Sequence, residues 1–272
     1  MKDNLARHDA AVTDRQRLTG SAYADGRHLA ARQSLYRWQQ PRYDLPGIVS
    51  AQLADVGGTV VDVGCGNGRF LQRLRSDRPE RRSVGLDVSA GILKEVPEPV
   101  LVADAGALPF GDGSVSAVIG MHMLYHVTDI DAAVAEFARV LEPGGVAAVS
   151  TNSDRDKWEL EELWKHAAGD VLGVPEGPSR VSLSSRFSLE EAPGFLGKVF
   201  GNVREIALPG VIEVTSPEPV VAHLASYQAW ADECGVPFEE TVRRARERVT
   251  AVIADSGSFR ATCRGGILVC RP

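Results

Sequence analysis

A glycine-rich turn constrains the fold of this chain more than any other feature. A β-branched run at residues 59–63 leads into Gly64, Gly66 and Gly68, and a helical pattern follows at 69–75. Glycine is required where a backbone turns tightly and approaches a ligand closely. A turn of this kind lies at the carboxyl end of a strand, where open α/β sheets bind ligands. We therefore expect the main binding site at this turn.

Strand-like and helix-like runs alternate from this point. The strand-like runs are short, nearly continuous in apolar residues, and lie at 59–63, 83–87, 100–103, 115–120 and 146–151. Such runs are typical of parallel strands covered on both faces, and right-handed crossovers then give a doubly wound sheet. The pattern predicts an α/β fold of the Rossmann-like kind.

The alternation ends after residue 151, and the flanking segments differ in composition. We expect a helical cover at 1–45 and an α/β domain at 46–272, with a lid insertion rich in aromatic residues at about 152–200. Within this part, Ser188 and Glu191 fit a capping box that starts a helix. The remaining expectations are a strand pair at 203–214, helices at 216–233 and 238–255, and a final strand at 259–271 interrupted by two glycines.

Composition narrows the class of protein. The 272 residues include 30 Lys and Arg against 36 Asp and Glu, a formal net charge of −6, which argues against wrapping nucleic acid. No apolar stretch approaches the ~20 residues of a membrane span, and no secretory signal is evident. The four cysteines lack a C-x-x-C pair, so we expect a reducing cytoplasmic compartment without a disulfide scaffold or zinc cluster.

The residues around the turn indicate what it binds. A dinucleotide site needs a third glycine where this chain has Arg69, and Asp62 would repel a pyrophosphate. A carboxylate there suits a ligand with an ammonium and a sulfonium, which matches S-adenosylmethionine. Asp87, at the end of the next strand, is placed to accept ribose hydroxyls. Asp104, at the end of the third strand, is placed to accept from an adenine amino group.

Taken together, these motifs resemble class I S-adenosylmethionine-dependent methyltransferases of the small type 11 kind. The motifs occur in family order, as D-V-G-C-G-N-G at 62–68, A-D-A-G-A-L-P-F at 103–110, M-L-Y-H-V at 123–127 and R-V-L-E-P-G-G at 139–145. They cover a little over a third of the chain. The resemblance implies a seven-stranded, mostly parallel sheet of order 3-2-1-4-5-7-6, whose last strand is antiparallel.

The resemblance also implies roles for individual residues. The cofactor would be held at its methionine part, largely through backbone, at its ribose by Asp87, and around its adenine. The cofactor-binding set is Asp62, Gly64, Cys65, Gly66, Asn67, Asp87, Val88, Asp104, Ala105 and Met121, with Met121 near the sulfonium.

Each assignment has a structural alternative. The glycines could form only a turn, Asp87 could be an acid satisfied by a helix dipole, and Asp104 could cap its own loop. Cys65 is interpreted as a packed side chain, because nothing indicates a lowered thiol pKa.

The segment after the fourth strand carries the acceptor-side candidates. His122 is a candidate general base, with a structural or pocket-lining histidine as the alternative. Tyr125 and His126 are candidate acceptor-binding residues, although His126 also fits a structural role. Some family members have acids here, and their absence leaves no support for a metal site, so we expect none.

Segments outside the sheet would cover the site, because an electrophilic methyl must be kept from water. Tyr23, Arg32 and Tyr36 are candidates to close over the cofactor, with Arg32 pairing its carboxylate. The alternative is an amphipathic helix that only packs on the sheet. Trp158 would line the acceptor wall, unless it joins Trp164 and Phe187 in a small core.

The sequence thus predicts methyl transfer from S-adenosylmethionine to a small-molecule acceptor in specialised metabolism. A small acceptor is favoured by the negative charge, the lack of an N-P-P-Y motif and the flanking lids. The arginines at 243–248 alternate with acids, as on a solvated surface. An RNA or protein methyltransferase is one alternative, and a non-methylating catalyst or binding module is another. The acceptor stays unidentified, and a homodimer is left open.

Overall fold

The chain divides into two compact units in the computed structural model, which describes the backbone of residues 2–272 and the side chains of residues 8–272. The core unit comprises Tyr43–Asp154, Leu183–Leu208 and Gly265–Pro272. The helical unit comprises Met1–Arg42, Arg155–Ser182 and Pro209–Arg264. The boundaries of these units differ from those of the expected helical cover (1–45) and α/β domain (46–272). The expected division into a cover and an α/β domain stays a prediction.

The sheet confirms the expected fold class. The strands are β1 (Gln39–Gln40), β2 (Val60–Val63), β3 (Ser83–Asp87), β4 (Val100–Val102), β5 (Val115–Met121), β6 (Leu141–Asn152), β7 (Asn202–Val214) and β8 (Phe259–Arg271). Their order is β1-β7-β8-β6-β5-β2-β3-β4. Strands β2 to β6 pair in parallel, and β8 is antiparallel to β6. This is the implied order with β1 added, so the sheet has eight strands instead of seven.

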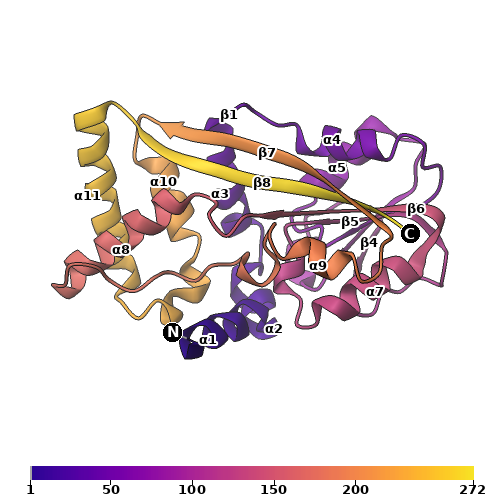
Figure 1. The fold of residues 1–272 in the computed structure, drawn as a ribbon, viewed down its shortest axis with the longest axis horizontal. Helices are drawn as coiled ribbons and strands as arrows, with labels where there is room; N and C mark the ends of the chain where they lie inside the picture. The colour runs from indigo at the N-terminus through magenta and orange to yellow at the C-terminus, as the bar shows by residue number, and fades with distance from the viewer. Residues whose placement is uncertain (1) are drawn as a thin grey trace. The chain divides into compact units, whose positions relative to one another are not determined.

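The core unit is built by helices on both faces of its strands. Its helices are α4 (Leu45–Gln52), α5 (Arg69–Asp77), α6 (Ala90–Leu93), α7 (Ile130–Val140) and α9 (Ala192–Leu196), with short helical turns η3 (Leu124–His126) and η4 (Ser185–Phe187). Figure 1 shows α4 and α5 on one face and α7 and α9 on the other. Alternate strand residues face α4 and α5 because side chains alternate along a strand. The hydrophobic core on this face contains the buried residues Val49, Leu53, Val60, Leu74, Ala117, Ile119, Val146, Ala148, Ile267 and Val269.

The helical unit gathers three distant segments of the chain. Its elements are α1 (Lys2–Thr13), α2 (Arg15–Arg17), η1 (Leu18–Ala22), α3 (Arg27–Leu35), η2 (Tyr36–Trp38), α8 (Trp158–Leu172), α10 (Glu218–Ala225), η5 (Gln228–Glu233) and α11 (Phe238–Ser256). Helix α11 packs on α8 and α10, and α10 packs on α3. Trp164 and Phe238 hold α8 to α11 with ring centroids 5.4 Å apart.

Several expected elements differ from those observed. The expected strand pair at 203–214 was wrong, because β7 runs unbroken from Asn202 to Val214. Strand β8 also runs unbroken, since Gly265 and Gly266 pair with Asn152 and Thr151 of β6.

Two expected helices have other bounds. Ser188 Oγ accepts the Glu191 N–H at 3.4 Å, as one half of the expected capping box does, but the turn it begins leads into α9 only at Ala192. The helix expected over 216–233 ends at Ala225, where the Ser226 N–H bonds to carbonyls one turn back, and η5 follows. None of the helices in the described part of the chain is long and apolar enough to cross a membrane.

Candidate cofactor site

The glycine turn between β2 and α5 has a backbone that other residues adopt rarely. Gly64, Gly66 and Gly68 have φ angles of +68°, +55° and +71°. A Cβ on Gly64 would lie 2.7 Å from Cβ of Met123, closer than atoms of this kind approach. The left-handed conformation therefore favours glycine at all three positions, and Gly64 is also required by the Met123 side chain that packs over it.

Asp87, the last residue of β3, ties this turn to the neighbouring strand. Its Oδ2 accepts the Gly66 N–H at 3.0 Å and its Oδ1 accepts the Ser89 N–H at 2.9 Å. Burial raises the pKa of the Asp87 carboxyl, although these hydrogen bonds oppose the shift. A carboxylate offers about four acceptor positions, so two backbone donors leave capacity for further hydroxyl groups.

Asp62 is buried in the middle of β2 and lacks part of its hydrogen bonding. Asp62 is 1% exposed, and its Oδ2 has no hydrogen-bond partner within the described part of the chain. Burial and the charge of Asp87 together raise the pKa of Asp62 to about 8, and the Arg75 guanidinium offsets only part of this. A buried acceptor without a donor is costly. A cationic donor placed beside it would remove that cost.

These residues fit S-adenosylmethionine as a ligand. The carboxyl groups of the buried Asp62 and the half-buried Asp87 lie on adjacent strands, where two negative charges repel each other and favour a cation between or beside them. The nearest side chain to a Cβ built on Gly64 is that of Met123. Backbone approach and negative charge are the properties expected for the cofactor's ammonium-bearing part, whereas a pyrophosphate would meet repulsion.

Cys65, inside this turn, is a packing residue. Its side chain is buried, and a Cβ on Gly85 would come within 2.9 Å of its Sγ, so Gly85 makes room for it. Burial and the charges of Asp62 and Asp87 raise the pKa of the thiol. The protonated thiol is a poor nucleophile, which agrees with the interpretation of Cys65 as a packed side chain.

The candidate adenine-binding segment follows β4. Asp104 is exposed, and its Oδ1 accepts the Gly106 N–H at 2.9 Å, so it stabilises its own turn. Ala105 is buried, and Val88 is half-buried after β3. Asn67 receives a long contact of 3.5 Å from the Arg69 N–H. Binding of a cofactor by these four residues stays a prediction.

His122 follows Met121, the last residue of β5, in an unusual conformation. Its φ is +55°, and its N–H lies 3.1 Å from both the carbonyl and Oγ of Ser150. Left-handed conformations in residues other than glycine are uncommon, and they often occur at functional sites. Ser150, which fixes this conformation, was not found from the sequence, because serine in a strand carries no motif.

Arg186 holds the loop that carries Tyr125 and His126. Its guanidinium donates to the carbonyls of Tyr125, Val127 and Thr128. The two candidate rings meet edge to face, with centroids 4.7 Å apart. The described residues contain no cluster of three or more His, Cys, Asp or Glu side chains that could hold a metal ion.

The other candidates belong to the helical unit, where each has its own partners. Arg32 donates to the Ser226 carbonyl at 2.9 Å and lies over the Tyr23 ring, with Cζ 5.1 Å from the centroid. The Tyr36 hydroxyl accepts from Lys157 Nζ at 2.7 Å, and burial raises the Tyr36 pKa to about 12. Their role as a cofactor cover stays a prediction.

The aromatic residues of the expected lid separate into two groups. Trp164 and Phe187 are 1% and 0% exposed, in the helical and core units respectively, as expected of core residues. Trp158 is 48% exposed at the start of α8 and does not join a core. Its expected contact with an acceptor stays a prediction.

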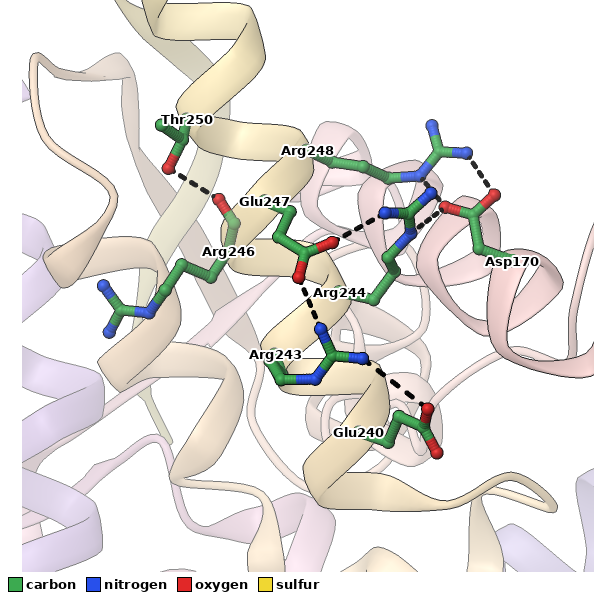
Figure 2. Close-up of polar contacts among 8 residues, drawn as sticks. All are labelled: Asp170, Glu240, Arg243, Arg244, Arg246, Glu247, Arg248 and Thr250. Carbon is green, nitrogen blue, oxygen red and sulfur yellow. Dashed lines mark hydrogen bonds and ion pairs between the residues drawn. The ribbon is translucent and has the colours of Figure 1, made fainter.

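The basic face of α11 is paired with carboxylates, as Figure 2 shows. Arg248 forms two hydrogen bonds to Asp170 of α8, and Arg244 pairs with both Asp170 and Glu247. Arg243 pairs with Glu240 and Glu247, and Arg246 pairs with Glu218. Each arginine already has a carboxylate partner, so this face is not an unneutralised basic stripe.

Part of this chain is similar in sequence to known methyltransferases. Residues 61–149 match the model of the family described as "Methyltransferase domain". The malonyl-[acyl-carrier protein] O-methyltransferase of Yersinia pestis is 33% identical over 118 residues, covering 42% of this chain and 43% of that protein. The tRNA (carboxymethyluridine(34)-5-O)-methyltransferase of Arabidopsis thaliana is 29% identical over 150 residues, covering 50% of this chain and 36% of that protein. The aligned part is thus less than half of each relative.

Solved structures share the fold at low sequence identity. The YcgJ protein of Bacillus subtilis matches with a TM-score of 0.53 at 16% identity, covering 83% of this chain and 97% of that one. A protein from an antibiotic biosynthesis pathway of Anabaena variabilis matches with a TM-score of 0.56 at 16% identity, covering 83% and 96%. Residues 61–149 of the chain therefore match a methyltransferase domain, in agreement with the resemblance expected from the sequence, and the solved structures share its fold.

Proposed function

We propose that this protein transfers a methyl group from S-adenosylmethionine to a small-molecule acceptor in specialised metabolism. One observation carries the proposal: the buried, incompletely bonded Asp62 lies in the strand that leads into a left-handed glycine turn, and Asp87 bonds that turn. A buried negative site of this kind supports a cationic cofactor. The acceptor class rests on the sequence arguments from charge and from the flanking segments.

Different residues of the core unit would bind three parts of the cofactor: its methionine part, its ribose and its adenine. Asp62 and the backbone of the turn would bind the methionine part, with Asn67 and Met121 beside it. Asp87 would bind the ribose hydroxyls with the acceptor capacity that its two backbone hydrogen bonds leave. Val88, Asp104 and Ala105 would surround the adenine. The bound cofactor supplies an electrophilic methyl group on a sulfonium centre.

The protein would contribute to catalysis mainly by positioning the acceptor and the cofactor. Aligning an acceptor with the methyl group for in-line displacement removes a large entropic part of the barrier. Tyr23, Arg32 and Tyr36 would exclude water from the cofactor, and Tyr125, His126 and Trp158 would contact the acceptor. His122 would accept a proton only from an acceptor that must lose one.

Labelled methyl transfer tests this proposal. The purified chain is incubated with methyl-labelled S-adenosylmethionine and four acceptor sets: small carboxylic acids, phenols and amines, a malonyl-loaded acyl carrier protein, and bulk tRNA. We expect label in a small-molecule pool, and less label at a subsaturating S-adenosylmethionine concentration when Asp87→Ala replaces the wild type. Label confined to tRNA would favour the second candidate, RNA methylation, which the plant relative suggests. Cofactor binding without S-adenosylhomocysteine formation would indicate a non-methylating protein.

His122 needs a variant that keeps its backbone. Asparagine tolerates a left-handed conformation better than most residues, so His122→Asn removes the imidazole with little strain. With an acceptor that loses a proton, we expect kcat to fall by about 100-fold or more, while the affinity for S-adenosylmethionine is unchanged. Wild-type turnover in this variant would make His122 a wall residue.

A further inference from the structure

We propose that the helical unit contains a carboxylate-binding site formed by Arg32 and Arg180, with His223 beside them. This inference rests on the proposed function in one respect, because it assigns the carboxylate to the methyl acceptor. The site itself is argued from the helical unit alone.

One aromatic ring brings the three side chains together. Arg32 comes from α3, Arg180 from the segment after α8, and His223 from α10. Arg180 Cζ lies 4.6 Å and Arg32 Cζ lies 5.9 Å from the Tyr227 ring centroid, and the His223 ring centroid lies 5.5 Å from it. The ring therefore holds two guanidinium groups and an imidazole around it.

These buried groups have unused hydrogen-bonding atoms. Arg32 Nη2, Arg180 Nη1 and both ring nitrogens of His223 have no hydrogen-bond partner within the described part of the chain, whereas Arg180 Nε lies 3.2 Å from Oε2 of Glu161. The residues Arg32 and His223 are only 8% and 3% exposed, and the Arg180 side chain is 11% exposed. Buried polar atoms in folded proteins are normally satisfied by protein, water or ligand. Arg32 Nη2, Arg180 Nη1 and the single N–H of a neutral His223 are donors around one ring, and they mark a place for an acceptor group.

The charges around the ring indicate what that group is. The cluster and its ion pairs contain three cations, which are Arg32, Lys157 and Arg180. They also contain two carboxylates, those of Asp156 and Glu161, so one positive charge is in excess. Arg32 makes no ion pair within the described residues. Burial and the nearby cations hold the His223 pKa well below its usual range, so the imidazole is neutral and adds no charge. A single negative charge would balance the cluster.

A carboxylate fits this cluster better than other anions do. The planar guanidinium fork matches the two oxygens of a carboxylate. Arg32 Cζ also lies 5.1 Å from the Tyr23 ring centroid and 5.9 Å from that of Trp230, which gives an organic carboxylate apolar surface to contact. A phosphate ester near neutral pH carries up to two charges and would leave an excess negative charge.

Calorimetry with simple probes tests the site in the full-length protein. Benzoate is titrated at pH 7 and constant ionic strength, with benzyl alcohol as the neutral control and phenyl phosphate as the phosphate control. We expect saturable benzoate binding, at least tenfold weaker phenyl phosphate binding, and no benzyl alcohol binding. Absence of benzoate binding would overturn the proposal and leave water as the partner of these atoms.

Variants locate the binding. Arg180→Gln and Arg32→Gln should each weaken benzoate at least tenfold, whereas Arg246→Gln, which removes an exposed arginine paired with Glu218 in the same unit, should not. Unchanged benzoate affinity in both folded site variants would overturn the assignment. If a site variant does not fold, the wild-type comparison of benzoate with benzyl alcohol remains decisive.

A second titration identifies the source of the carboxylate. Benzoate binding is measured again with saturating S-adenosylhomocysteine, which carries its own carboxylate. Unchanged affinity supports an acceptor carboxylate, whereas loss of binding would overturn that assignment in favour of the cofactor's carboxylate. Failure of the proposed function is separable, because a chain that binds benzoate but not S-adenosylmethionine keeps this site and loses the methyl donor.

Discussion

The two units of this protein enclose ionisable side chains of opposite kind. The core unit places the buried Asp62 and the half-buried Asp87 on neighbouring strands, and the helical unit buries the guanidinium groups of Arg32 and Arg180 around an aromatic ring. Isolated buried charges destabilise a fold unless a partner compensates them. Each unit therefore carries a local destabilisation that a ligand of opposite charge would relieve. The difference between the units indicates a cationic ligand for one and an anionic group for the other.

The largest expected effect tests the core unit through Asp62→Asn. The pKa of Asp62 is raised from 3.8 to about 8, so the ligand-free fold favours the protonated form. The wild type is then most stable below the unfolded pKa and loses stability as pH rises towards 8. Because asparagine does not titrate, the variant should gain stability relative to wild type over this window, by at most roughly 5 kcal/mol. Urea unfolding at pH 5 and pH 8 measures the difference.

Asp55→Asn is the matched control, because Asp55 is an exposed acid of the same unit. It should show no such pH dependence. A constant difference between Asp62→Asn and the wild type at the two pH values would show that the fold does not raise the pKa of Asp62, and the core unit would then carry no destabilised carboxyl group.

Asp87→Ala gives the next largest effect, now on cofactor affinity. Loss of its acceptor oxygens should weaken S-adenosylmethionine binding by about 1–3 kcal/mol, because hydroxyl groups would lose a charged partner. The Gly66 N–H also loses its acceptor, so Asp87→Asn is compared as a variant that retains one oxygen. Isothermal titration calorimetry gives the affinities, and an affinity equal to wild type in Asp87→Ala would exclude the ribose role.

Tyr36→Phe moves the test to the helical unit. The hydroxyl accepts a 2.7 Å hydrogen bond from the buried Lys157 ammonium, which also pairs with Asp156. Removing one of these partners should lower the free energy of unfolding by about 1 kcal/mol. Thermal unfolding measures this, and an unchanged melting temperature would mean that Lys157 is satisfied by Asp156 alone. Cofactor affinity of the same variant tests whether Tyr36 also covers the cofactor.

The smallest effect is expected on the exposed surface of the same unit. Arg248→Gln removes two hydrogen bonds to Asp170, which keeps Arg244 as a partner (Figure 2). Exposed ion pairs contribute little because water and salt screen them. We expect a small fall in melting temperature that diminishes further in high salt. A large, salt-independent fall would mean that this pair, and not the buried cations, dominates the electrostatics of the helical unit.

The sequence predicted the core unit well because its signals are local. Strand β3 lies at the expected residues, and the turn at Gly64 to Gly68 has the left-handed backbone that only glycine adopts easily. Asp62 and Asp87 are carried by adjacent strands, so their neighbourhood follows from the parallel sheet alone. The extension of β6 back to Leu141 was missed, since the Pro-Gly-Gly segment resembles a loop.

The helical unit could not be predicted in the same way. Arg32, Arg180 and His223 come from three distant segments, and none of them lies in a recognisable motif. Trp158 and Trp164 are the same residue type within one expected insertion, yet only Trp164 lies on the buried side of α8 with Leu160 and Leu163. Which arginine is buried, and which tryptophan is exposed, depends on tertiary packing that no local pattern records.

Calorimetric titration of the full-length protein with S-adenosylmethionine tests the central claim, a cationic cofactor beside Asp62, most directly. At pH 7, in two buffers of different ionisation enthalpy, the account predicts one binding site and release of a proton from Asp62, whose pKa of about 8 should fall when a cation binds beside it. The proton release should vanish in Asp62→Asn. Absence of binding, or binding whose proton release is identical in wild type and Asp62→Asn, would contradict it.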